Sequence, residues 1–68
     1  MTLAQEKRHA DLMRRFGGDM HYWTGYLTGL EGRSEHHDAL LAGIGSPDLE
    51  RTRRGRGYRD GLERRGAA

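Results

Sequence analysis

The sequence predicts an all-α fold, a small helical domain of three to four short helices. Apolar residues recur at helical spacing in several segments, and no segment alternates apolar and polar residues as a half-buried strand does. Glycines and capping residues divide the chain into pieces of helix length. With 68 residues, of which 34% are hydrophobic, the chain suffices for one domain, residues 1–68, with a thin core.

The first helix is expected over residues 3–16, within an N-terminal extension of residues 1–18. Thr2 and Gln5 have the spacing of a capping box, and the glycine pair that starts at Gly17 ends the helix without steric cost. The apolar stripe of this helix consists of His9, Leu12, Met13 and Phe16.

Asp19 is placed to cap a second helix over residues 20–31. Its apolar residues recur at a spacing that forms a seam for burial against another helix. The seam consists of Met20, Trp23, Leu27 and Leu30. We expect Phe16, Met20 and Trp23 to pack in the core around the glycine turn. The alternative is an exposed apolar patch for self-association or for a partner.

Two further helices are expected, one over residues 34–42 and one from Pro47 to about residue 64. Ser34 is a candidate cap for the third helix, and Ser46 before proline is typical of a helix start. The last helix contains three glycines before its end, and each costs roughly 1 kcal/mol relative to alanine. We therefore expect it to become ordered only against the rest of the protein or a partner.

A seven-residue cassette occurs twice in the chain. The pattern Gly-Tyr-x-x-Gly-Leu-Glu begins at Gly25 and again at Gly57, 32 residues later. Glycines four residues apart lie on one helix face, where another backbone can approach closely. We expect the two cassettes to cross, with their tyrosines over the gaps. The alternative is a surface against which RNA or protein backbone presses. The residues concerned are Gly25, Tyr26, Gly29, Gly57, Tyr58 and Gly61.

Charge is unevenly distributed along the chain. The net charge is +2 in residues 1–16, −5 in residues 17–50 and +5 in residues 51–68, and all basic residues except Lys7 are arginine. Arginine grips phosphate through a planar fork and stacks on bases. The basic C-terminal segment therefore suits an anionic partner, or the acidic middle of this chain or of a second copy. A solvated charged surface is the remaining interpretation.

The segment Gly25-Tyr26-x-x-Gly29-Leu30-x-Gly32-Arg33-Ser34 resembles the ribosome modulation factor family. The resemblance covers residues 22–65, lacks the family's Cys-Pro-Tyr loop, and leaves the N-terminal helix as an addition. It implies a core over residues 19–65 that binds ribosomal RNA or ribosomal protein of the small subunit and modulates translation. The arginines implied to contact RNA are Arg33, Arg51, Arg53, Arg54, Arg56 and Arg59.

The sequence contains no motif for catalysis, metal or cofactor. It has no cysteine, and its four histidines lack metal-ligand spacing. Its C-terminal glycines are not followed by the Lys-Ser/Thr of a phosphate loop. We therefore expect no enzyme activity, no metal ion and no cofactor.

Two alternatives to ribosome binding remain open. One is a phage or mobile-element regulator that binds and inhibits a host protein, such as a defence or transcription component, as a homodimer that uses the acidic middle as its contact surface. The other is a self-assembling scaffold peptide. No apolar run reaches the length of a membrane span, so we expect a soluble, cytoplasmic protein with no membrane partner.

Overall fold

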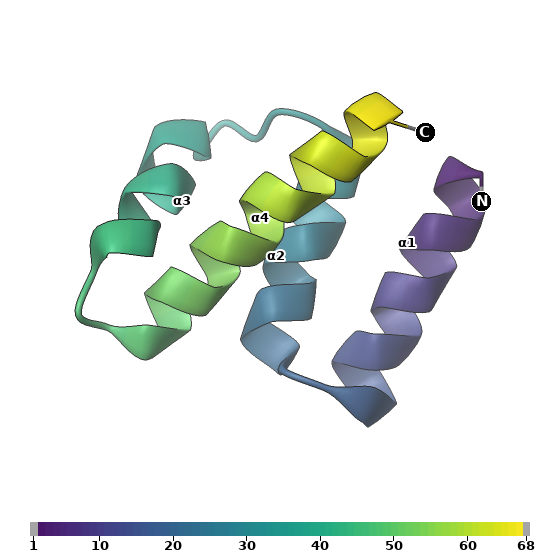
Figure 1. Ribbon diagram of the computed structural model, residues 1–68, viewed down its shortest axis with the longest axis horizontal. Coiled ribbons are helices and arrows are strands. Elements are labelled where there is room, and N and C mark those ends of the chain that lie inside the picture. The colour runs from purple at the N-terminus through teal and green to yellow at the C-terminus, as the bar shows by residue number, and fades with distance from the viewer. Residues whose placement is uncertain (1, 68) are drawn as a thin grey trace.

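The computed structural model describes residues 2–67, and the prediction of an all-α fold is confirmed (Figure 1). The elements in chain order are α1 (Leu3–Leu12), the π-helical segment η1 (Met13–Gly17), α2 (Met20–Glu31), α3 (His37–Ala42), the 3-10 segment η2 (Gly43–Gly45) and α4 (Leu49–Ala67). Helix α4 crosses α2, α1 packs against α2, and α3 with η2 packs against α4. No helix within residues 2–67 is long and apolar enough to cross a membrane.

The first two helices begin at their predicted caps. The Thr2 hydroxyl accepts a hydrogen bond from Gln5 N at 3.2 Å, and the Gln5 side chain accepts one from Thr2 N at 2.8 Å. Asp19 Oδ1 accepts from the backbone N–H groups of His21 and Tyr22 at 3.0 and 3.3 Å. These bonds satisfy donors that the first turn of each helix leaves unpaired.

Two helix boundaries differ from the prediction because local bonds replace regular helix. The first helix continues beyond Leu12 as η1, whose π-type hydrogen bonds widen the final turn, and not as α-helix to residue 16. The third helix begins at His37 and not directly after Ser34. Ser34 Oγ accepts a hydrogen bond from His36 N at 3.0 Å, which closes a turn before the helix.

Helix α4 begins later than predicted, at Leu49. Ser46 Oγ accepts a hydrogen bond from Asp48 N at 3.1 Å, and Asp48 Oδ1 accepts one from Glu50 N at 3.0 Å. Asp48 therefore caps the helix, while Ser46 and Pro47 form the approach to it. The helix then runs along α2 and α3 to Ala67. Its dependence on the rest of the protein for order stays a prediction.

Helices α2 and α4 meet backbone to backbone at the two cassettes, as predicted. A Cβ atom added to any cassette glycine would overlap a carbonyl oxygen of the opposing helix. The glycine–carbonyl pairs are Gly25–Arg54, Gly29–Tyr58, Gly57–Tyr22 and Gly61–Tyr26. Each carbonyl belongs to the residue three positions before the equivalent glycine of the other cassette, so a local twofold axis relates the cassettes. The glycine Cα–H groups point at these oxygens, a recurring weak bond at close helix contacts.

The rings of the cassette tyrosines do not cover the glycines, which corrects one expectation. The carbonyl groups of Tyr26 and Tyr58 lie over the opposing glycines instead. The Tyr58 side chain is completely buried and its hydroxyl lies beside Ser34 at the end of the α2–α3 loop. The half-buried Tyr26 side chain lies toward α1, with its hydroxyl 3.5 Å from Glu6 Oε2. The helices are too close for aromatic rings to lie between them.

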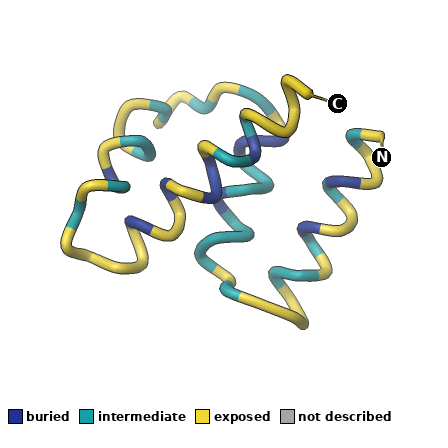
Figure 2. Tube along the Cα trace, viewed as in Figure 1, coloured by how far each residue is buried: buried dark blue, intermediate teal, exposed yellow. Residues whose placement is uncertain are grey.

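The predicted apolar stripe of the first helix is largely exposed. Leu12 is 51% exposed and Phe16 is 81% exposed, and the neighbouring Met20 is 55% exposed. Figure 2 shows exposed positions along α1 and through the turn that leads to α2. The residues that α1 buries are Glu6 and Ala10. Core packing of Phe16 and Met20 around the glycine turn is therefore wrong, because α1 packs through a different face than its apolar pattern indicates.

The predicted seam of α2 is only partly buried. Leu30 is fully buried, Trp23 and Leu27 are half-buried, and Met20 is exposed. Trp23 packs edge-on against the His9 ring of α1, with ring centroids 5.8 Å apart. Because α2 presents its glycine face to α4, the apolar seam is left to α1, which is too polar to cover it completely.

Candidate nucleic-acid interface

The six arginines implied to contact RNA are all exposed, but they lie in three separate places. Arg51 and Arg54 line a pocket between α2, α3 and α4. Arg33 lies in the turn after α2, beside Ser34, which lines the same pocket. The remaining three, spaced three residues apart on the exposed side of α4, are Arg53, Arg56 and Arg59. The structure therefore does not gather the predicted site into a single surface.

The exposed side of α4 is partly neutralised by carboxylates. Arg53 Nε lies 3.2 Å from Asp19 Oδ2, and Arg59 Nε lies 3.5 Å from Asp60 Oδ1. Among residues 2–67, Arg56 has no carboxylate within 4.0 Å. These exposed pairs contribute little to stability, but they lower the positive potential that an RNA phosphate would meet.

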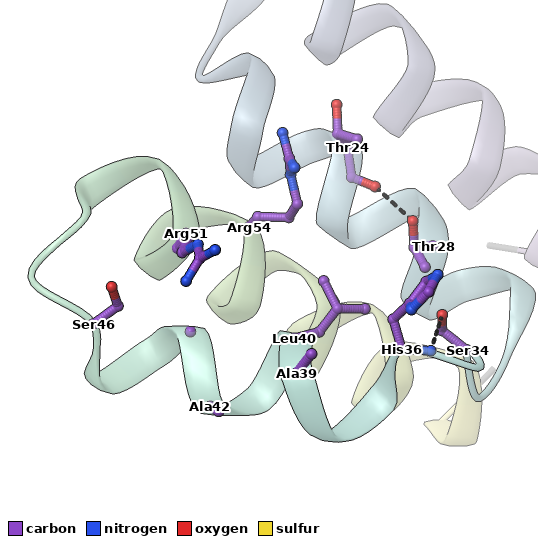
Figure 3. Close-up of a pocket in the computed structure, with 11 residues that line it drawn as sticks. Thr24, Thr28, Ser34, His36, Ala39, Leu40, Ala42, Ser46, Arg51 and Arg54 are labelled. Atoms are coloured by element: carbon purple, nitrogen blue, oxygen red, sulfur yellow. Dashed lines mark hydrogen bonds between the residues drawn. The ribbon is translucent and has the colours of Figure 1, made fainter.

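The pocket beside α4 has a different composition. Its volume is about 770 Å³, and no acidic residue is among its lining residues (Figure 3). Four of its side chains carry hydroxyl groups: Thr24, Thr28, Ser34 and Ser46. The other residues that line it are His36, Ala39, Leu40, Ala42, Gly43, Arg51 and Arg54. Guanidinium and hydroxyl groups are the donors that proteins commonly direct at phosphate oxygens.

A histidine holds Arg54 at the rim of the pocket. Arg54 Nη2 lies 3.1 Å from His21 Nδ1, and His21 Nε2 lies 3.5 Å from Glu50 Oε1. Because Nδ1 accepts from the guanidinium, the imidazole proton is on Nε2 and faces Glu50. This contact leaves the other guanidinium N–H groups of Arg54 available to a ligand.

The wall of the pocket near Ser34 is fixed by the buried hydroxyl of Tyr58. That hydroxyl accepts a hydrogen bond from Ser34 N at 3.0 Å and shares one with His37 Nδ1 at 2.6 Å. The cassette pattern places Tyr58 at the helix contact and gives no signal for its bonds to Ser34 and His37, which lie 24 and 21 positions away in the chain.

Outside the pocket, two phenols of the described residues lie beside carboxylates. Within residues 2–67, no three histidine, aspartate or glutamate side chains are grouped to hold a metal ion. The Tyr22 hydroxyl donates to Asp60 Oδ2 at 2.6 Å, and burial with this bond raises the pKa of Tyr22. Burial and the nearby Glu6 carboxylate likewise raise the pKa of Tyr26. Both phenols therefore stay protonated at neutral pH.

Comparisons with protein-family models, curated proteins and solved structures find no match to this chain. The resemblance to the ribosome modulation factor family therefore stays a prediction that rests on the residues quoted for it. The functional proposal therefore depends on the position of Arg51 and Arg54 in the pocket.

Proposed function

We propose that this chain is a non-catalytic RNA-binding protein that docks on ribosomal RNA and modulates translation. The observation that carries the proposal is the carboxylate-free pocket in which Arg51 and Arg54 join four hydroxyl-bearing side chains. The choice of ribosomal RNA as target follows from the family resemblance, whereas phosphate as the bound group follows from the chemistry of the pocket. A catalytic role is not part of the proposal.

Phosphate contacts fix a protein on RNA, and they come from arginine, from hydroxyl side chains and from backbone N–H groups. Arg51 and Arg54 lie one helical turn apart, so both guanidinium groups approach one phosphate or two neighbouring phosphates. Thr24 supplies a hydroxyl from the facing helix, whereas the Thr28 hydroxyl donates to Thr24 O at 3.1 Å and offers only its oxygen as an acceptor. In RNA, the 2′-hydroxyl offers these side chains a further partner that DNA lacks.

The acidic middle of the chain is compatible with this proposal because its carboxylates lie outside the pocket lining. Asp19 pairs with Arg53, Glu50 lies beside His21, and Glu35 lies 3.3 Å from His36 Nε2. None of these three carboxylates is among the residues that line the pocket.

Co-sedimentation with small ribosomal subunits, repeated over a series of salt concentrations, tests the proposal. We expect Arg51→Ala with Arg54→Ala to weaken binding about tenfold or more and to flatten the salt dependence. The matched control, Arg56→Ala with Arg59→Ala, removes the same charge from the other side of α4 and should weaken binding about threefold or less. Equal losses in the two double variants, or no co-sedimentation of the unaltered protein, would contradict the proposal.

A specific observation favours the alternative of a protein partner or a homodimer. Leu12, Phe16 and Met20 are three large apolar side chains exposed around one turn, and such a patch is typical of interaction sites. The alternative predicts a stoichiometric host-protein complex, or a dimer in light scattering, that survives nuclease treatment. Phe16→Ser should then dissociate the host-protein complex or the dimer and leave RNA binding unchanged.

A further inference from the structure

A second recess lies beside α2, on the side that faces the first helical segment and not α4. It has a volume of about 590 Å³ and lies between the first helical segment and α2. Thr24 and Thr28 line both this recess and the pocket beside α4, so the two are adjacent and share a floor on α2. The cations of the recess are Lys7, Arg8 and Arg14, and its carboxylates are Asp11 and Glu31.

The charges of the recess are only partly balanced. Arg14 Nη2 lies 2.7 Å from Asp11 Oδ1, which occupies both groups. Lys7 and Arg8 have no carboxylate within 4.0 Å in the described part of the chain. Fold topology thus brings two basic segments from opposite ends of the sequence to the two sides of α2, with Lys7 and Arg8 on one side and Arg51 and Arg54 on the other.

We infer that the two recesses form one continuous binding track, in which a single RNA strand crosses α2 and reaches from Arg51 and Arg54 to Lys7 and Arg8. Helix α1 is then part of the RNA-binding surface. This inference rests on the proposed function, because it extends the same pocket. It assigns a binding role to Lys7 and Arg8, which the sequence did not single out.

The shape of the track favours a single strand over a duplex. Recesses of about 770 and 590 Å³ have the size of small-ligand pockets, so each admits part of one strand and not a complete double helix. No phenylalanine, tyrosine or tryptophan lines either recess. Binding should therefore follow the phosphates with little preference for base sequence, since stacking is limited to the His36 ring and to guanidinium planes.

Fluorescence anisotropy with labelled RNA of mixed sequence tests the inference. One oligonucleotide has about 4 nucleotides, enough for the pocket alone, and the other has about 12 nucleotides, enough for both recesses. The test variant is Arg8→Glu and the matched control is Arg56→Glu, because Arg56 is also exposed, has no carboxylate within 4.0 Å among residues 2–67 and lies outside both recesses. We expect Arg8→Glu to weaken binding of the longer RNA about fivefold or more, and Arg56→Glu about twofold or less. Neither should change binding of the shorter RNA by more than about twofold.

The outcomes separate this inference from the proposed function. If Arg51→Ala with Arg54→Ala weakens binding but Arg8→Glu behaves like Arg56→Glu, the pocket binds RNA and the track is wrong. If none of these variants changes binding, both proposals are wrong. Tighter binding of an RNA hairpin than of the single strand would contradict the single-strand assignment. Equal competition by an acidic peptide of the same charge would show that the track recognises negative charge and not RNA.

Discussion

The contact between α2 and α4 and the attachment of α1 to these two helices are built differently. The first is made by glycine faces and opposing carbonyl groups at the cassettes. The second depends on side chains, above all the carboxylate of the buried Glu6, which lies 2.7 Å from Arg64 Nε on α4 and 3.5 Å from the Tyr26 hydroxyl on α2. Backbone contact fixes helix positions closely, whereas a side-chain contact adapts to substitution.

This difference bears on the two halves of the proposed RNA track. The pocket lies between α2, α3 and α4, and glycine–carbonyl contacts fix α4 against α2 at the cassettes and against α3 and η2 at Gly55 and Gly43. The second recess depends on α1. This helix is held by the contacts of Glu6 with Arg64 and Tyr26 and by a small buried residue, Ala10. We therefore expect a rigid binding site in the pocket and an adjustable one beside α1.

The largest effect is expected from a methyl group in the α2–α4 contact. Gly57→Ala would place a Cβ atom against the carbonyl oxygen of Tyr22, so the helices must separate. Overpacking of this kind costs about 3 kcal/mol, a large part of the stability of a domain this small. The matched control is Gly66→Ala, where no neighbouring atom lies within 4 Å and stability should stay the same or rise slightly. Thermal unfolding followed by circular dichroism measures both; equal melting temperatures would refute the backbone contact.

A smaller effect is expected from the hydroxyl that fixes the pocket wall. Tyr58→Phe leaves Ser34 N and His37 Nδ1 without their buried partner, which should cost about 1–2 kcal/mol. Tyr26→Phe is the control, because its hydroxyl contact with Glu6 is 3.5 Å long and part-buried. Denaturant unfolding should rank Tyr58→Phe below Tyr26→Phe in stability, and the reverse order would contradict the assigned network.

A still smaller and local effect is expected in the attachment of α1. Glu6→Gln removes the charge that faces Arg64 but keeps the shape of the side chain, so the loss should be about 1 kcal/mol. Hydrogen exchange should show faster exchange of the α1 amides while those of α2 and α4 keep their protection. Glu63→Gln, an exposed change on α4, is the control. Uniform loss of protection in all helices would mean that α1 is not a separate unit of stability.

The last prediction concerns the pH dependence of stability, which is expected to change only above about pH 10. It involves one tyrosine in each of the two contacts. Tyr22 joins α2 to α4 through Asp60, and Tyr26 joins α2 to α1 beside Glu6. Folding raises both pKa values above the usual value of about 10, so the unfolded chain loses these protons first. Stability should therefore be constant from neutral pH to about pH 10 and fall as the pH rises further. Tyr22→Phe should reduce that alkaline loss, and an unchanged pH profile would contradict the role of the Tyr22–Asp60 bond.

Local sequence patterns predicted much of the fold because they depend on residues a few positions apart. The capping box at Thr2, the cap at Asp19 and the repeated glycines were all readable in this way, and the glycines also predicted the α2–α4 contact. The apolar stripe of the first helix misled because α1 is attached through Glu6. A buried carboxylate with an arginine partner from the far end of the chain leaves no periodic signal.

The candidate site was predicted in composition but not in arrangement. The sequence identified the arginines of α4, yet their division between pocket and exposed side depends on how α4 is rotated against α2. That rotation is set by glycine–carbonyl pairs on the opposing helix, and a basic run alone does not encode it. Lys7 and Arg8 were missed because only the folded chain brings them beside Thr24 and Thr28.

The most direct measurement is an NMR titration of the isotopically labelled protein with the shorter RNA, followed through backbone amide shifts. Saturable shifts should concentrate at residues of the pocket, in particular Thr24, Thr28, Ser34, Arg51 and Arg54. Shifts confined to the exposed side of α4, at Arg53, Arg56 and Arg59, or no saturable shifts at all, would contradict phosphate binding in the carboxylate-free pocket.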